Sequence, residues 1–181
     1  MQTERGGFGG FVARERTKPI IAAVDGPALA GGTELVLAAD LVVASRTAVF
    51  GIPEVKRGLV AAAGGLFRLP RKIPRNIAME LALTGRLDFS AEQAHHFGWV
   101  NRLCEEGEAL ETAQQLANEI AQNAPLAVRE SRAIVLGATD QPDDVAWKMS
   151  GEGIIKMFGT EDVAEGLNAF IEKRDPVWKG R

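Results

Sequence analysis

The sequence has few of the features that mark secreted, membrane-spanning or nucleic-acid-binding proteins. Cys104 is the only cysteine among the 181 residues, which excludes an internal disulfide and suits a reducing compartment. No apolar run reaches ~18 residues, the length that a transmembrane helix needs. The first residues lack the charged and apolar regions of a signal peptide, and the net charge of -3 offers no basic footprint for nucleic acid. We therefore expect a cytoplasmic protein with neither a membrane nor a nucleic-acid partner.

The signatures of several enzyme classes are also absent. There is no Gly-x-Ser-x-Gly motif and no P-loop, so serine acyl hydrolysis and phosphoryl transfer lack support. His95 and His96 are adjacent, so on a helix they point in different directions and make a poor metal site. The glycine-rich segment 6–10 follows no strand, which argues against a dinucleotide loop. We expect it to be flexible or to cap a neighbouring element, and we expect a short helix over 11–16.

The segment from Asp25 to Asp40 organises the chain. An apolar run over 20–24 stops at a turn, Asp25-Gly26-Pro27, and a stretch of small residues with Gly31 and Gly32 follows. The next residues predict a short helix over 33–39. This order of strand, glycine turn and helix leaves free backbone N–H groups at the start of the helix, where they can hold an oxyanion.

Continuous apolar runs over 19–25 and 40–44 indicate strands that are covered on both faces, as in α/β proteins. A third, short strand is expected over 48–51. Further along, Pro74 fits a helix start and Gly85 a helix end. We also expect a closing strand over 98–103.

The remaining chain is predicted to be helical from residue 107 onward. Ser90 and Gln93 fit a capping box just before this part. Pro125 restarts the helical pattern, and Thr160 is expected to cap the last helix. The apolar stripe of that helix consists of Val163, Leu167, Phe170 and Ile171.

Two glutamates are candidates for chemistry. Glu34 lies in the helix after the glycine turn, and Glu54 follows Pro53 at the exit of the next pair of strands. Both lie in apolar surroundings, and a pair of carboxylates can act as general base and general acid. Gly31 is a candidate oxyanion donor through its backbone N–H. The alternatives are two buried structural glutamates with backbone partners and a plain glycine at a helix start.

These residues resemble the enoyl-CoA hydratase/isomerase (crotonase) family, and the resemblance runs from about Lys18 to the C-terminus. It rests on several segments that occur in order and at consistent spacing. They are 18–26, Ala30-Gly31-Gly32-Thr33-Glu34-Leu35, Phe50-Gly51-Ile52-Pro53-Glu54, Gly64-Gly65, Leu83-Thr84-Gly85 and 165–174.

The resemblance implies an α/β fold, a crotonase-like spiral of β-β-α turns, followed by a helical region that builds a trimer or a pair of trimers. Residues 1–124 would form part of the spiral and 125–181 the oligomerisation region. The family acts on acyl-CoA thioesters in fatty acid metabolism. Coenzyme A is part of the substrate, and no metal or other cofactor is implied.

The resemblance also implies roles for individual residues. Gly31 would be the second oxyanion donor, and Glu34 and Glu54 would add water across the 2,3 double bond of an enoyl-CoA. Ala30, Leu59 and Ala62 would contact the substrate together with Gly31, whereas Phe170 and Lys173 would meet CoA. The implied activity is that of an enoyl-CoA hydratase. Isomerisation, dehydration of a substrate such as carnitinyl-CoA, and a non-catalytic short form that only binds acyl-CoA are the alternatives.

Three departures from the family pattern stand out. Family members begin well before the position equivalent to Lys18, so the opening turns and the first oxyanion donor are expected to be missing here. The run 60–63, Val-Ala-Ala-Ala, replaces the usual Pro-Gly-Ala before Gly64, which is expected to alter a contact with the catalytic water. Ala30 replaces a common glycine, and we expect this change to be tolerated.

Overall fold

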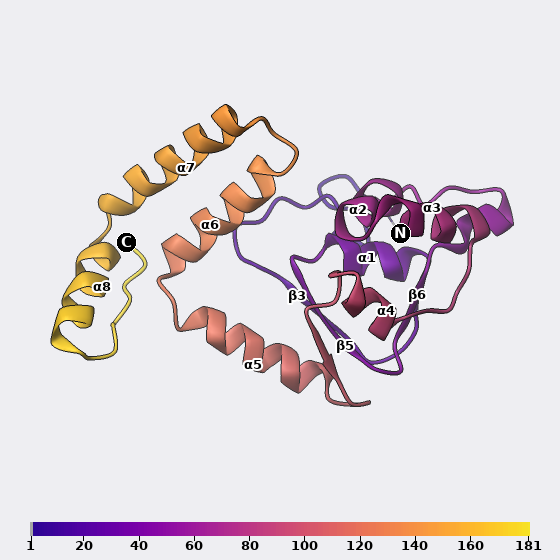
Figure 1. Cartoon of the computed structure of the whole chain (residues 1–181), viewed down its shortest axis with the longest axis horizontal. Helices are drawn as coiled ribbons and strands as arrows, with labels where there is room; N and C mark the ends of the chain where they lie inside the picture. Colours follow the sequence, from indigo (N-terminus) through magenta and orange to yellow (C-terminus); the bar gives the residue numbers. More distant parts are fainter. Residues whose placement is uncertain (1) are drawn as a thin grey trace. The chain divides into compact units, whose positions relative to one another are not determined.

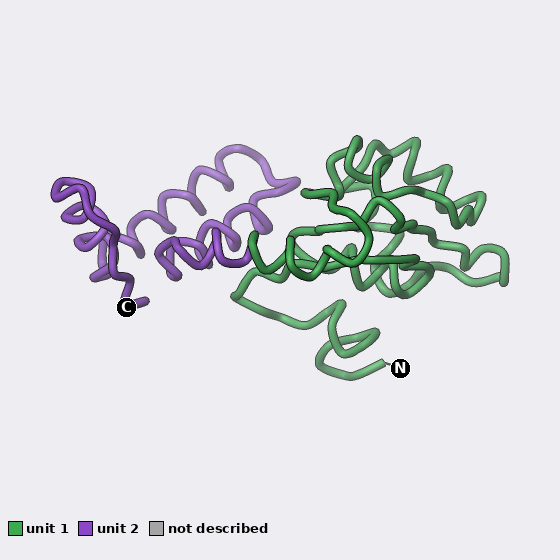
Figure 2. Tube along the Cα trace, turned by 90° about the horizontal axis from the view of Figure 1, so that it is seen from below, with its two compact units in different colours: residues 1–116 green, residues 117–181 purple. Residues whose placement is uncertain are grey.

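The computed structural model describes residues 2–181, which form two compact units. The first unit ends at Leu116 and the second begins at Ala117, within one helix, α5 (Ala109–Ala121) (Figure 2). The sequence-based boundary at 124/125 lies further along the chain, and that domain assignment stays a prediction.

The first unit contains a parallel sheet in the order β3-β5-β8. Strand β3 (Ile21–Val24) pairs along its whole length with β5 (Leu41–Ser45), and β8 (Arg102–Cys104) pairs with the other edge of β5. Figure 1 labels β3 and β5 of this sheet. The predicted closing strand is therefore present, but it forms at its C-terminal end only, because residues 98–101 make a turn that buries Trp99 against Phe50.

A second sheet has the order β4-β6-β7. Strand β4 (Ala28–Leu29) is parallel to β6 (Val49–Gly51), and β7 (Phe89–Ser90) is antiparallel to β6. Each of the two early turns of the chain thus contributes one strand to each sheet before a helix follows. The helices are α1 (Gly31–Ala38) after the first pair and, after the 3-10 helix η1 (Pro53–Arg57), α2 (Gly65–Lys72) after the second. The predicted α/β architecture of β-β-α turns is confirmed.

The two long apolar runs differ in how far they are covered. In β5, Val42, Val43 and Ala44 are at most 2% exposed, so both faces of that strand are buried. In β3, Ala23 is exposed, so the prediction of burial on both faces is wrong there. The two strands differ in their position in the sheet, because β5 lies between two strands, whereas β3 is an edge strand of the described sheet. An edge strand has neighbouring side chains on one side only, so its faces are less covered. A continuous apolar run does not distinguish the two positions.

The N-terminal segment is not a flexible tail followed by a helix. Strand β1 (Gln2–Thr3) and strand β2 (Gly7–Phe8) form an antiparallel hairpin. The expected helix over 11–16 is absent, because the N–H of Ala13 bonds back to the Gly6 carbonyl at 3.0 Å rather than continuing a helical pattern. Positive φ angles at neighbouring glycines turn the chain back on itself here.

The local helix signals of the first unit are confirmed. Helix α3 (Arg75–Thr84) starts directly after Pro74 and ends at Gly85, which adopts the left-handed conformation and donates its N–H to the Leu81 carbonyl. Helix α4 (Ala91–His96) begins with a complete capping box between Ser90 and Gln93. These signals are short-range, so they do not depend on the rest of the fold.

The second unit is helical, with α6 (Pro125–Ala138), α7 (Asp143–Phe158) and α8 (Glu161–Glu172). Helices α6 and α7 pack against each other (Figure 1). The Lys156 ammonium on α7 donates to the Glu130 carboxylate on α6 at 2.7 Å. Thr160 occupies the N-cap position of α8, but its hydroxyl donates to the Met157 carbonyl, so it does not cap the helix as expected. Among the helices of residues 2–181, none combines the length and the apolar character that crossing a membrane requires.

Candidate active site

A pocket of about 470 Å³ lies within the first unit. We call it the glutamate pocket. It is lined by the hairpin segment (Gln2, Gly7, Phe8, Val12, Ala13), by α1 (Gly31, Glu34), by the segment before α2 (Glu54, Val60, Ala62, Ala63, Gly64) and by α2 (Phe67, Arg68). Its volume falls in the range that small-molecule sites occupy, about 300–1,000 Å³. Both candidate glutamates and the candidate oxyanion donor therefore line the glutamate pocket.

Gly31 is the first residue of α1, so its N–H has no partner within the helix. The start of this helix is hydrogen-bonded to strands β4 and β6 of the second sheet. The Thr33 hydroxyl lies 2.5 Å from the Ala28 carbonyl oxygen and 2.9 Å from that of Gly51, and it accepts the Gly51 N–H at 3.0 Å. The Thr33 side chain is only 1% exposed. These hydrogen bonds fix the direction in which the Gly31 N–H points.

Ala30 precedes this helix in a conformation that alanine rarely adopts. Its φ is 52° and its ψ is -124°, and its N–H donates to the Gly51 carbonyl at 2.8 Å. A positive φ brings the β-carbon of a non-glycine residue close to its own backbone. The substitution of alanine for the family's common glycine is therefore accommodated, but with backbone strain.

Replacing Ala30 by glycine is expected to stabilise the protein by about 1 kcal/mol, because glycine adopts this conformation without strain. The midpoint of urea unfolding measures the effect. Ala38→Gly, within α1, is the matched control, and it should destabilise by about 0.5–1 kcal/mol. Equal destabilisation by the two substitutions would contradict the strain at Ala30.

Glu34 projects from α1 into the buried side of the glutamate pocket. Glu34 is 4% exposed, and its Oε1 accepts the Gly65 N–H at 2.9 Å. Burial raises the pKa of Glu34, and the nearby charge of Glu54 raises it further, whereas the Gly65 hydrogen bond acts in the opposite direction. The carboxyl group thus has the backbone partner that a structural role would require, and it also faces a pocket.

Glu54 is held differently. It is the second residue of η1, directly after Pro53, and it is only partly buried as a whole. Its Oε2 is nevertheless buried and has no hydrogen-bond partner among the described residues. A buried carboxylate oxygen without a partner costs free energy, so its retention in a pocket points to a function.

The raised pKa of Glu34 predicts how stability depends on pH. A carboxyl group whose pKa is higher in the folded than in the unfolded state contributes stability below the unfolded value of 4.5, and this contribution is lost as the pH rises through the folded value. Glu34→Gln removes the titration, so the variant should gain stability relative to the unmodified protein as the pH rises above 4.5. Urea unfolding at several pH values measures the difference. Glu111→Gln, on an exposed position of α5, is the control and should show no such trend.

The other predicted substrate contacts in the first unit are only partly gathered at the pocket. Ala62 lines it, whereas Leu59 is 63% exposed and is not among the lining residues. Val60, the next residue, lines the pocket instead. Val60, Ala62 and Ala63 of the altered run thus line one wall, and the run leads to the Gly65 N–H that binds Glu34.

Phe8 and Arg68 are among the lining residues that the sequence analysis does not identify as site residues. Arg68 donates to the Val12 carbonyl at 2.6 Å and to the Ala63 carbonyl at 3.1 Å, so it ties the hairpin segment to α2. Burial lowers the pKa of this guanidinium. No local signal marks Phe8, because the glycines around it are typical of flexible segments and only the folded chain carries it to the pocket.

Phe170 and Lys173 belong to the second unit, at the end of α8. Phe170 is 85% exposed, and Lys173 ends the helix with a φ of 55°. Their predicted contact with CoA stays a prediction. Within residues 2–181, no group of three or more His, Cys, Asp or Glu side chains is arranged so that it could hold a metal ion.

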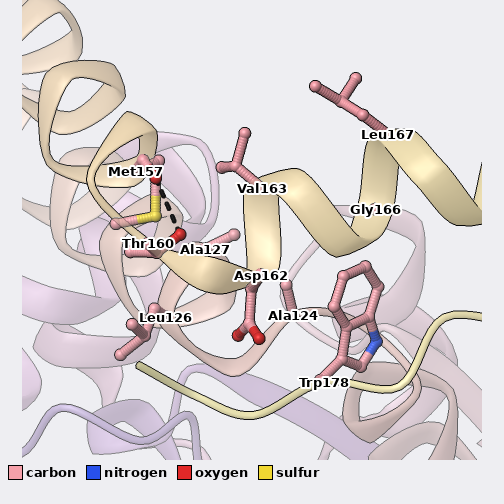
Figure 3. Close-up of a pocket in the computed structure, with 10 residues that line it drawn as sticks. All are labelled: Ala124, Leu126, Ala127, Met157, Thr160, Asp162, Val163, Gly166, Leu167 and Trp178. Carbon is pink, nitrogen blue, oxygen red and sulfur yellow. Dashed lines mark hydrogen bonds between the residues drawn. The ribbon is translucent and has the colours of Figure 1, made fainter.

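A second pocket of about 270 Å³ lies within residues 117–181, and its lining contains none of the predicted site residues (Figure 3). Its polar groups already bind the chain's own C-terminal segment. The buried Asp162 carboxylate accepts the N–H groups of Lys179 at 2.7 Å and Gly180 at 3.0 Å, and the Trp178 indole donates to the Gln122 carbonyl at 2.6 Å. We assign this pocket a structural role.

Comparison with known proteins agrees with this geometry. Residues 12–181 match the family model for enoyl-CoA hydratase/isomerase. Carnitinyl-CoA dehydratases from Salmonella heidelberg and Salmonella typhimurium are 42% identical, over 97% of this chain and 69% of theirs.

Two solved structures are also similar. The crystal structure of an enoyl-CoA hydratase from Mycobacterium tuberculosis H37Rv has a TM-score of 0.95 and 51% identity, covering 99% of this chain and 71% of that one. A probable enoyl-CoA hydratase/isomerase from Mycobacterium abscessus has a TM-score of 0.93 and 54% identity, covering 99% and 70%. The predicted crotonase-like fold is thereby confirmed.

Proposed function

Because the chain belongs to the enoyl-CoA hydratase/isomerase family, we propose that it is an enoyl-CoA hydratase, which adds water to the double bond of a 2-enoyl-CoA thioester. The observation that carries the proposal is the meeting of Gly31, Glu34 and Glu54 in one pocket. Each of the three has a distinct part in the chemistry of hydration.

Gly31 is placed to stabilise the enolate. Attack of water on the β-carbon of the enoyl group moves electron density onto the thioester oxygen, and a backbone N–H aimed at that oxygen stabilises the charge as it develops. The N–H of Gly31 lacks a partner within α1, and the positive end of the helix dipole lies at the same place.

The glutamates are proposed to handle the protons. One carboxylate takes a proton from the water whose oxygen bonds to the β-carbon, and the other carboxyl delivers a proton to the α-carbon as the enolate collapses. The product is the 3-hydroxyacyl-CoA, and delivery from one side of the substrate gives syn addition. The raised pKa of Glu34 lets this carboxyl group hold a proton at a higher pH than an ordinary glutamate, and the Oε2 of Glu54 has no hydrogen-bond partner among the described residues, so it is available to a proton of the substrate or water. The reaction is neither an oxidation nor a reduction, so we propose no cofactor beyond the coenzyme A of the substrate.

A second candidate is dehydration of a 3-hydroxyacyl-CoA of the carnitinyl-CoA type. It is favoured by the carnitinyl-CoA dehydratases that are 42% identical to this chain. Dehydration is the reverse of hydration, so the same Gly31, Glu34 and Glu54 would serve it. The two candidates differ in the substrate's acyl group, not in the reacting groups of the protein.

We also propose that copies of the chain assemble through the second unit into a trimer, or a pair of trimers. Large apolar side chains are exposed along α7 and α8, including Trp147 at 76%, Phe158 at 70% and Ile171 at 75%. Exposed apolar surface of this extent is typical of an interface. Phe170 and Lys173, at the end of α8, are proposed to meet CoA. A cytoplasmic role in fatty acid metabolism is consistent with the free thiol of Cys104.

The activity is tested with crotonyl-CoA, whose conjugated thioester absorbance disappears on hydration, and with carnitinyl-CoA, which gains that absorbance on dehydration. Chromatography identifies the product. Turnover of enoyl-CoA to the 3-hydroxyacyl-CoA supports the hydratase, and turnover of carnitinyl-CoA alone supports the dehydratase. Binding of acyl-CoA without turnover of any substrate would instead show a non-catalytic member of the family.

A further inference from the structure

The Phe8 side chain lies against the candidate oxyanion donor. A methyl group added at Gly31 would sit 2.5 Å from Cζ of Phe8 and 2.6 Å from Cε1, so the edge of the ring occupies the space next to the Gly31 α-carbon. Both residues line the glutamate pocket. From this contact we infer that Phe8 limits the size of the acyl group that the pocket accepts next to the reacting atoms. The inference rests on the proposed function, because it names the substrate class of the same site.

The backbone that carries Phe8 is held at several points. The Phe8 carbonyl accepts the N–H groups of Phe11 and Val12 at 3.2 and 3.3 Å, and the Val12 carbonyl in turn accepts Arg68 from α2 at 2.6 Å. Gly9 packs on Leu35, since a methyl group at Gly9 would lie 3.0 Å from Cδ2 of that leucine. The ring therefore has a fixed support on α1 and α2, as a wall of a pocket requires.

The position of the substrate follows from the hydrogen bond that Gly31 would make. An oxygen bound by the Gly31 N–H lies about 2.9 Å from the nitrogen, and the thioester carbon lies one bond further away. The first carbons of the acyl chain must then pass within van der Waals reach of a ring that touches the same glycine. The ring bounds the pocket and does not fill it, because about 470 Å³ remains with Phe8 in place.

Two other apolar side chains of the lining, Phe67 and Val60, are less suited to this role. Phe67 is 52% exposed, and the guanidinium groups of Arg68 and Arg71 lie 4.9 and 5.8 Å from its ring centroid. Val60 is 64% exposed. Phe8 differs from both in its direct contact with the residue that would hold the thioester oxygen.

The test compares Phe8→Ala and the milder Phe8→Leu with the unmodified chain on crotonyl-CoA and on the longer octenoyl-CoA. The expected result is a rise of about tenfold in the ratio of kcat/KM for octenoyl-CoA over crotonyl-CoA in Phe8→Ala, and a smaller rise in Phe8→Leu, because a methylene group in an apolar pocket is worth about tenfold or more. Phe11→Ala is the control. Phe11 belongs to the same segment and lies under Arg16, outside the pocket lining, so its removal should leave the ratio unchanged.

Calorimetric affinities for butyryl-CoA and octanoyl-CoA give a second reading of the same preference that needs no turnover. An unchanged ratio in Phe8→Ala and Phe8→Leu, in a chain that hydrates crotonyl-CoA, overturns the inference alone. A shifted affinity ratio in a chain without turnover supports the inference and overturns the proposed hydratase. Absence of both turnover and acyl-CoA binding overturns the inference and the proposed function together. A shift in the kcat/KM ratio of Phe11→Ala equal to that of Phe8→Ala would overturn the inference alone.

Discussion

Replacing Glu34 or Glu54 by glutamine is expected to lower kcat for hydration by about 10²–10⁴-fold, the usual contribution of a positioned general acid or base. Glutamine keeps the size of each side chain, and its carbonyl oxygen can still accept the Gly65 N–H that Glu34 accepts at 2.9 Å. The fold and the binding of substrate should therefore change little. Stopped or continuous assays with crotonyl-CoA measure kcat, and calorimetry with butyryl-CoA measures binding.

The double variant Glu34→Gln/Glu54→Gln tests whether the two carboxyl groups act as a unit. If they do, the loss in the double variant should be close to that of the more damaging single variant, because residues that act together are strongly non-additive. Glu111→Gln provides a control at an exposed position of α5. Retention of kcat within a few-fold in both single variants would remove the glutamates from the mechanism.

The Gly31→Ala variant is expected to lose about 10²-fold in kcat/KM, the size of effect that a displacement of about 1 Å at a reacting group can have. The added methyl group would lie 2.5 Å from Phe8, so either the ring or the start of α1 must move. Gly32→Ala is a matched control one residue along the same helix. Its methyl group would meet no heavy atom nearer than the Ala28 β-carbon at 3.9 Å, so its activity should be nearly normal.

A double variant separates two causes of the loss at Gly31. If the methyl group acts by pushing against the Phe8 ring, Gly31→Ala/Phe8→Ala should recover much of the activity. If it acts by disturbing the N–H itself, the second substitution should bring no recovery. Normal activity of Gly31→Ala alone would contradict the assignment of this residue as the oxyanion donor.

The candidate site could be anticipated from the sequence to the extent that it depends on short-range patterns. The strand, turn and helix around Gly31 and Glu34 lie within one short stretch of chain, and the helix expected over 33–39 forms two residues earlier, over Gly31–Ala38. Glu54 follows the next strand in the same manner. Because successive β-β-α turns stack, their equivalent positions meet, and the resemblance to the family already implied this arrangement.

The N-terminal segment could not be anticipated in the same way. Its glycines permit many conformations, and positive φ angles at Gly7, Gly9 and Gly10 are set by what the segment packs against. The contact of Phe8 with Gly31 and the bond from Arg68 to Val12 join parts of the chain that are distant in sequence. No local pattern indicates such contacts, so the sequence alone predicts a flexible or capping segment.

Hydrophobic periodicity and capping chemistry predict the α/β class and the helix ends at Gly85 and Ser90, and the structure confirms them. The resemblance to the family adds the β-β-α turns and the candidate residues Gly31, Glu34 and Glu54, whose roles stay predictions. Three features depend on contacts between distant parts of the chain: the edge position of β3, the bond from the Gly65 N–H to Glu34, and the placement of Phe8 at the pocket by the hairpin. The physical reason is that burial and close contact depend on all the neighbours of a residue in space, whereas propensity and capping depend on its neighbours along the chain.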